Sequence, residues 1–85
     1  MRPVKLFYLE RCPFCKRAFA YIEELKKEER YKDIVIETIE ESFHPEIAEL
    51  YNYYYVPTFY IDERKEHEGG IFKEEVKAIF EKALQ

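Results

Sequence analysis

The chain has 85 residues, 47% of them hydrophobic, and its 14 lysines and arginines against 18 aspartates and glutamates give a net charge of −4. This length fits one domain over residues 1–85, and the acidic balance argues against a nucleic-acid partner, which favours a basic surface. No apolar run approaches the roughly 20 residues that cross a membrane, and the N-terminal stretch lacks a secretory-signal pattern, so we expect a cytoplasmic protein.

The first half of the chain predicts a strand, a helix and a second strand. Residues Val4–Leu9 are apolar, aromatic and β-branched, which is typical of a buried strand. A helix is predicted from Pro13 to about Glu29, and Ile34–Ile39 is predicted as the second strand. Such a βαβ unit pairs its two strands in parallel. The apolar stripe of the helix consists of Ala18, Ile22 and Leu25.

The second half predicts a short helix, a strand hairpin and a last helix. His44-Pro45 opens the short helix, since proline is tolerated in a first helical turn. Thr58–Ile61 is the third strand, and the polar segment Lys65–Glu68, after a turn, suits a sheet edge. Gly69-Gly70 precedes the last helix. The side chains expected to face inward are Ile47, Leu50 and Tyr51 in the short helix and Phe72, Val76, Ile79, Phe80 and Ala83 in the last one.

These elements predict an α/β domain in which a mixed four-stranded sheet is flanked by three helices, in the order β-α-β-α-β-β-α. The first two strands run parallel with a right-handed crossover, and the second half ends in a hairpin and a covering helix. Both cysteines of the chain, Cys12 and Cys15, lie at the junction between the first strand and the first helix.

The geometry of a helix start predicts different roles for Cys12 and Cys15. If Cys12 is the N-cap residue, Pro13 takes the first helical position, where its missing N–H costs nothing. The backbone N–H of Cys15 then points to the Cys12 sulfur, which also receives the positive end of the helix dipole. Neighbouring positive charges come from Arg11, Lys16 and Arg17. Because these effects favour a thiolate, we expect Cys12 to attack a substrate disulfide and Cys15 to resolve the mixed disulfide.

Other roles for a close cysteine pair fit the sequence less well. A strand-to-helix junction is a poor place for two passive core residues. A zinc site needs about four ligands, and only His44 and His67 could supplement the pair, neither at a paired-ligand spacing; we therefore expect no metal site within the chain. A non-enzymatic carrier, in which a dimer holds a metal or iron–sulfur cluster between its CxxC pairs, stays open as an alternative.

The segment Cys-Pro-Phe-Cys, after an apolar strand in a chain of this order and length, resembles the glutaredoxin and small thioredoxin-like proteins. It is close to the glutaredoxin pattern Cys-Pro-Tyr-Cys, whereas thioredoxins usually carry Gly-Pro between the cysteines. The resemblance covers nearly the whole chain and includes Val56-Pro57-Thr58 before the third strand and Gly69-Gly70 before the last helix. It implies a thioredoxin-like fold and thiol–disulfide oxidoreductase activity.

The resemblance also implies a substrate site around the cysteines. In the family the proline that corresponds to Pro57 is cis and lies against the cysteine pair, and the backbone before it is suited to pairing with an extended thiol substrate. The residues expected to bind substrate are Arg11, Pro13, Phe14, Tyr55, Val56, Pro57, Gly69 and Gly70. No tightly bound cofactor is implied. Glutathione is the candidate co-substrate of a monomer, and the candidate partners are disulfide-containing proteins and a thioredoxin reductase.

Departures from the glutaredoxin pattern leave the reductant open. Leu9 stands three residues before the first cysteine, where glutaredoxins generally have a lysine that reaches the glutathione carboxylate. Tyr55 replaces a frequent threonine, and Ile71 and Phe72 follow the glycines in place of a small or polar residue and an aspartate. The amides that begin the last helix are suited to accept a carboxylate. Candidate substitutes for the lysine are Arg11 and Lys16. Electrons then come from glutathione or, in a glutaredoxin-like thioredoxin, from a thioredoxin reductase.

Two further groups of residues lie near the predicted site. Tyr51 and Tyr53 are expected in the core, whereas Tyr54 and Tyr55, just before Val56, are candidates for a surface that docks a protein partner. Acidic side chains of the second strand and the short helix are expected to form a solvated face, consisting of Glu37, Glu40, Glu41, Glu46 and Glu49.

Overall fold

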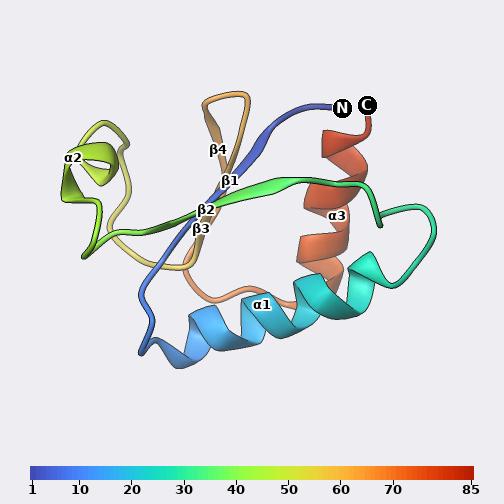
Figure 1. Ribbon diagram of the computed structural model, residues 1–85, viewed down its shortest axis with the longest axis horizontal. Coiled ribbons are helices and arrows are strands. Elements are labelled where there is room, and N and C mark those ends of the chain that lie inside the picture. The colour runs from blue at the N-terminus through green and yellow to red at the C-terminus, as the bar shows by residue number, and fades with distance from the viewer.

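The computed structural model describes residues 1–85 as a mixed four-stranded sheet with helices on both faces (Figure 1). The strands lie in the order β2-β1-β3-β4, with β1 parallel to β2 and antiparallel to β3, and β3 antiparallel to β4. The predicted fold class and element order are confirmed. The elements are β1 (Val4–Tyr8), α1 (Pro13–Lys26), β2 (Ile36–Glu40), α2 (Pro45–Ala48), β3 (Thr58–Ile61), β4 (Arg64–Glu68) and α3 (Lys73–Ala83).

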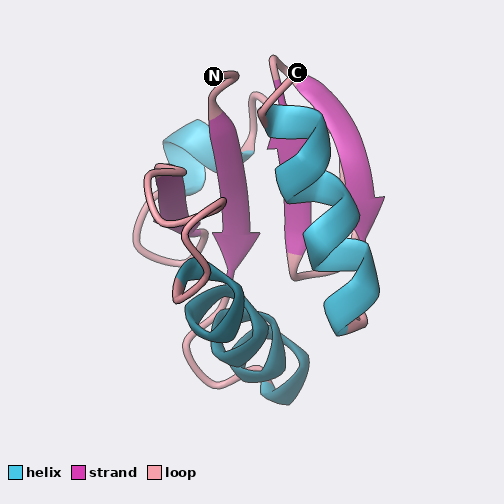
Figure 2. Ribbon diagram, turned by 90° about the vertical axis from the view of Figure 1, so that its right-hand side faces the viewer, coloured by secondary structure: helices cyan, strands magenta, loops and turns pink.

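The alternation of side chains along the central strands divides the core into two layers. Leu6 of β1 belongs to the larger cluster, which is built with the buried stripes of α1 and α3. Its neighbour Phe7 points to the other face and contacts the rings of Tyr51 and Tyr60 at centroid distances of 4.8 and 5.8 Å. In Figure 2 the two long helices lie in front of the sheet and the short α2 lies behind it.

The first helix ends earlier than predicted, at Lys26 rather than near Glu29. A buried tyrosine explains the difference. Tyr31 is 1% exposed, its ring lies 5.5 Å from that of Phe80, and its hydroxyl donates to Glu81. These contacts with α3 draw the chain away from the axis of α1, so that charged residues form turns before β2 begins.

Two side chains predicted to face inward are exposed instead. Leu50 is 80% exposed because α2 is a single turn that ends at Ala48, and the spacing that would carry Leu50 to the inner face exists only in a helix. Phe72 is 75% exposed. It is the N-cap of α3 and lies before the first helical residue, so it does not share the inward face of the helix that the prediction gave it. The other predicted residues of α3, from Val76 to Ala83, are buried.

The hairpin of β3 and β4 closes one side of the sheet. Asp62 and Glu63 form its turn with φ values of 50° and 67°, a left-handed pair typical of tight hairpins. Strand β4 pairs only with β3, and each of its residues, Arg64–Glu68, is charged or ionisable, which confirms the predicted polar edge. None of the three helices has the length and apolar character that a membrane crossing requires.

Candidate active site

The junction between β1 and α1 positions Cys12 at the N-cap of the helix. Its backbone is extended, with φ −91° and ψ 115°, and Pro13 follows in the first turn. The Cys12 Sγ accepts a hydrogen bond from the backbone N–H of Cys15 at 3.3 Å. Sulfur therefore takes the place that a serine or aspartate oxygen holds at many helix starts. The predicted local geometry of the pair is confirmed.

The two cysteines differ in exposure. Cys15 is 1% exposed, whereas Cys12 is half-buried. Burial and, after it, the neighbouring Cys12 sulfur raise the pKa of the Cys15 thiol to about 12. The two thiols therefore differ: the Cys12 sulfur is partly accessible to solvent, whereas the Cys15 thiol is buried and protonated near neutral pH.

In the reduced protein, we expect iodoacetamide to label Cys12 and to leave Cys15 unlabelled. At about pH 8 a thiol of pKa about 12 is ionised in roughly one molecule in 10,000, whereas an ordinary cysteine of pKa about 8.5 is ionised in about a quarter of molecules. Native Cys15 should therefore react on the order of a thousandfold more slowly than in guanidinium chloride, and its rate should rise with pH toward about 12. Peptide mass spectrometry measures both sites; equal rates in the native protein would contradict the expectation.

The loop before β3 faces the Cys12 sulfur. Its Val56–Pro57 peptide bond is cis, as the resemblance implied. The Cys12 Sγ lies 3.9 Å from the Val56 carbonyl oxygen, and the Gly69 N–H donates to the Pro57 carbonyl at 2.8 Å. The N–H and C=O of Val56 make no backbone hydrogen bond. The Val56 N–H thus has no partner and the Val56 C=O accepts only from the Cys12 thiol, so both are available to pair with an extended chain laid across the sulfur.

Gly69 and Gly70 allow the turn before α3 to approach the cysteine pair. Gly69 has a φ of +89°, a conformation that residues with a side chain rarely adopt. A Cβ on Gly70 would lie 3.2 Å from Cδ1 of Phe14, so glycine lets the Phe14 ring rest against the turn. The same turn is held from β4, because Nε2 of His67 donates to the Gly70 carbonyl at 2.7 Å.

Four of the exposed aromatic side chains come from the first turn of α1, the loop before Val56 and the turn before α3, and we call them the aromatic collar. Their exposed fractions are 53% for Phe14, 86% for Tyr54, 70% for Tyr55 and 75% for Phe72. Phe14 and Phe72 line one cleft of about 310 Å³, and Tyr55 packs over Gly69. Grouped exposed aromatic rings are typical of surfaces that contact other proteins. The other two tyrosines of this segment, Tyr51 and Tyr53, pack against Phe7 in the second core layer, as predicted.

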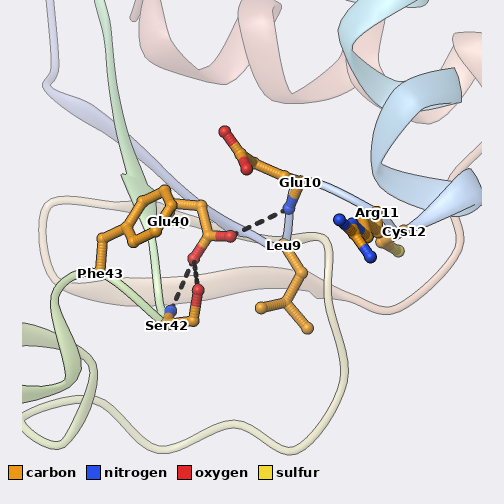
Figure 3. Close-up of a pocket in the computed structure, with 7 residues that line it drawn as sticks. All are labelled: Leu9, Glu10, Arg11, Cys12, Glu40, Ser42 and Phe43. Atoms are coloured by element: carbon orange, nitrogen blue, oxygen red, sulfur yellow. Dashed lines mark hydrogen bonds between the residues drawn. The ribbon is translucent and has the colours of Figure 1, made fainter.

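A pocket of about 380 Å³ lies beside Cys12, between the β1–α1 loop and the segment after β2 (Figure 3). Glu40 lines it and is 6% exposed, so its assignment to a solvated face was wrong. Its carboxylate accepts from the Glu10 N–H at 3.0 Å and from the N–H and the hydroxyl of Ser42, both at 2.6 Å. The Ser42 hydroxyl and these N–H groups lower the pKa of Glu40. An ionised glutamate thus ties the loop before Cys12 to the end of β2.

Glu68 and Glu75 hold two other loops of the site. Glu68 Oε2 accepts from the N–H groups of Tyr54 and Tyr55 at 2.5 and 3.0 Å, and Lys65 together with these N–H groups lowers the pKa of Glu68 to about 2. Glu75 Oε1 accepts from the Phe72 N–H at 2.9 Å. Neither role was predicted. A glutamate at the third helical position is recognised as a capping signal when serine or threonine is the N-cap. Here the N-cap residue is Phe72, so the sequence did not indicate that Glu75 would cap the helix.

The predicted substrate-binding residues all lie in the segments that meet at Cys12. Arg11 lines the pocket of Figure 3, and Pro13 is exposed in the first turn of α1. Their part in binding a substrate stays a prediction. No group of three or more histidine, cysteine, aspartate or glutamate side chains is arranged to hold a metal ion.

Comparison with protein-family models gives a match to glutaredoxin over residues 4–66. The chain belongs to the glutaredoxin family. The matched part includes both cysteines and Val56-Pro57, and it ends before Gly69 and the last helix. A comparison of this glutaredoxin-family chain with curated protein sequences gives no match.

Solved structures share the fold of this glutaredoxin-family chain over nearly its whole length. Oxidised thioredoxin from Plasmodium falciparum is 26% identical with a TM-score of 0.73, covering 95% of this chain and 79% of that one. A mutant thioredoxin from Halobacterium salinarum is 20% identical with a TM-score of 0.73, covering 99% and 75%. A malarial protein, 16% identical, has a TM-score of 0.77 and coverage of 100% and 99%. Family membership and fold together support a thiol–disulfide oxidoreductase in general.

Proposed function

We propose that the chain exchanges two electrons between its Cys12–Cys15 pair and a disulfide, with Cys12 as the nucleophile and Cys15 as the resolving thiol. The observation that carries this proposal is the 3.3 Å contact between the Cys15 amide and the Cys12 sulfur at the start of α1. The amide and the helix dipole stabilise negative charge on that sulfur. Cys15 is buried and its thiol stays protonated until the mixed disulfide on Cys12 has formed.

The exchange takes place in two displacements. The Cys12 thiolate attacks one sulfur of the substrate disulfide, so that a Cys12–substrate S–S bond forms while the substrate bond breaks and one thiolate leaves. Cys15 then loses its proton and attacks Cys12 Sγ, which releases the second substrate thiolate. The protein is left with a Cys12–Cys15 disulfide, the substrate has gained two electrons, and the released thiolates take up protons.

The substrates that this site suits are disulfides in other proteins. An extended segment on either side of a substrate cysteine can pair with the unpartnered N–H of Val56 and with its C=O, which accepts only from the Cys12 thiol. The aromatic collar offers exposed apolar contact area, and aromatic residues contribute strongly to protein interfaces. The expected docking role of Tyr54 and Tyr55 is part of this proposal.

The oxidised pair must then be reduced by a second thiol donor. Two donors are candidates, glutathione and a thioredoxin-reductase-like enzyme, and the likeness to thioredoxins favours the second. We take the chain to work as a monomer without a tightly bound cofactor, in a reducing compartment such as the cytoplasm, where a close cysteine pair is more often catalytic than structural.

The test uses the Cys15→Ser variant, in which exchange should stop at the mixed disulfide on Cys12. Intact mass after acid quenching measures how fast this adduct forms with a protein disulfide, such as that of insulin, and with the small neutral bis(2-hydroxyethyl) disulfide. A further Phe14→Ser change should slow the reaction with the protein about tenfold, as expected for an interface hot spot, and leave the small disulfide within about twofold.

Val35→Ser is the matched control. Val35 is 74% exposed and precedes β2. It lies at the end of the sheet opposite to Cys12, because β1 and β2 are parallel and Val4 pairs with Ile36. This change should leave both rates unaltered. An adduct that fails to form with either disulfide would refute the exchange reaction, and equal slowing of both disulfides by Phe14→Ser would refute docking through the collar.

A further inference from the structure

Glutamates of the chain itself occupy several backbone N–H groups in the loops near Cys12, while the Val56 N–H stays free. This holds in each of three loops that come from different parts of the sequence: the β1–α1 loop, the loop before Val56 and the turn before α3. The pairs are Glu40 with the N–H groups of Glu10 and Ser42, Glu68 with those of Tyr54 and Tyr55, and Glu75 with that of Phe72.

Such N–H groups are the donors with which proteins hold small anions. Unpaired amides at a helix start or in a loop bind phosphates and carboxylates directly, and the helix dipole adds to the attraction at the start of α3. A glutamate on the same amide removes the donor and places a negative charge beside it. Glu40 and Glu68 are held ionised, because their hydrogen bonds lower the pKa of both carboxyls.

Two of the pairs belong to segments that contact Cys12 or line its pocket, and the third lies at a neighbouring cleft. Glu40 lines the pocket beside Cys12 (Figure 3). Tyr55, held by Glu68, directly precedes Val56, whose carbonyl oxygen is 3.9 Å from Cys12 Sγ. Phe72, held by Glu75, shares a cleft with Phe14, the residue between Pro13 and Cys15. An anionic disulfide that approaches Cys12 therefore meets carboxylates at the positions where it would find donors.

We propose that Glu40, Glu68 and Glu75 are specificity-determining residues that keep small anionic disulfides, such as oxidised glutathione, away from Cys12 and leave the site to protein disulfides. This inference rests on the proposed exchange reaction and deepens it. It also assigns the choice of partner to residues outside the cysteine pair. A protein substrate escapes the exclusion because it pairs with Val56 and contacts the aromatic collar, neither of which needs an anion-binding amide.

The experiment measures rate constants of adduct formation on Cys12 in the Cys15→Ser background with three small disulfides. These are the anionic oxidised glutathione, the neutral bis(2-hydroxyethyl) disulfide and the cationic cystamine. In each reaction a Cys12–S bond forms as the small disulfide breaks, and one thiolate leaves. Glu75→Ala and Glu68→Ala are each compared with Glu74→Ala, which removes an equal charge from an exposed first-turn residue whose carboxylate makes no hydrogen bond.

We expect Glu75→Ala and Glu68→Ala each to raise the ratio of the anionic to the neutral rate by about tenfold, the usual scale of one charge-assisted hydrogen bond. Glu74→Ala should change it by less than about twofold, since exposed charges are screened. Glu75→Gln, which keeps an acceptor oxygen on the Phe72 N–H, should stay near the parent ratio. Cystamine should show no rise in any variant.

Two results would overturn the inference. One is a ratio that neither alanine variant changes; the other is an equal rise in Glu74→Ala, Glu75→Gln and Glu75→Ala, which would indicate net charge in place of occupied amides. Circular dichroism checks that each variant is folded, and the Glu68 and Glu75 variants report independently of each other. Failure of the neutral disulfide to react at all would count against the exchange reaction itself, and not against this account of its selectivity.

Discussion

Replacing Cys12 with serine should reduce disulfide exchange by on the order of a thousandfold or more. Only a thiolate attacks a disulfide at useful rates, and a serine hydroxyl is not ionised near neutral pH. The fold should survive the change, because serine is a favoured N-cap residue and its oxygen can accept the Cys15 N–H that the sulfur now accepts. Insulin reduction and thermal unfolding measure the two quantities separately.

Cys15→Ser is the matched control for this prediction. The same atom is replaced at the buried cysteine of the pair, and the first displacement should continue, so that one equivalent of adduct accumulates on Cys12. Turnover should stop in both variants, but only the Cys15 variant should carry an adduct. Substantial turnover by Cys12→Ser, at an unchanged melting temperature, would show that Cys12 is not the nucleophile.

Phe80→Ala should lower the free energy of unfolding by about 3–5 kcal/mol, the usual cost of removing a buried phenylalanine. Phe80 is fully buried in the larger core cluster, where α3 meets the sheet, and its ring lies 5.5 Å from that of Tyr31. The substitution leaves a cavity at this contact. Urea unfolding followed by circular dichroism gives the difference in stability.

Phe72→Ala provides the comparison on the same helix. Phe72 is 75% exposed at the N-cap of α3, and its backbone N–H, which Glu75 accepts, is kept in the variant. This substitution should change stability by no more than about 0.5 kcal/mol. Similar costs for the two phenylalanines would mean that the core does not lie where the structure puts it.

Much of the fold could be predicted because the residues that form apolar patterns in the sequence are the same residues that are buried in the core. The stripe of Ala18, Ile22 and Leu25 is buried along α1, and Thr58–Ile61 forms β3 with the predicted bounds. The predictions from sequence patterns failed where an element is short, or where a contact with a distant residue determines the end of an element. Leu50 follows a helix of one turn, which is too short to impose a period, and the end of α1 depends on Tyr31 meeting α3.

The candidate site was predictable to the extent that its geometry is local. Cys12, Pro13 and Cys15 define a helix start by themselves, so the N-cap contact followed from spacing. The glutamates could not be found in this way. The N–H groups held by Glu40 and Glu68 belong in part to other segments of the chain, and with 18 acidic residues in the sequence nothing local singles them out.

The edge strand β4 has a consequence for behaviour at high protein concentration. A strand at the edge of a sheet has unpaired backbone groups through which copies of a domain can join, which is the first step of aggregation. Arg64–Glu68 places a charged or ionisable side chain at every position of that open strand. Two copies that met edge to edge would have to desolvate these charges. The composition of β4 thereby disfavours self-association through this edge of the sheet.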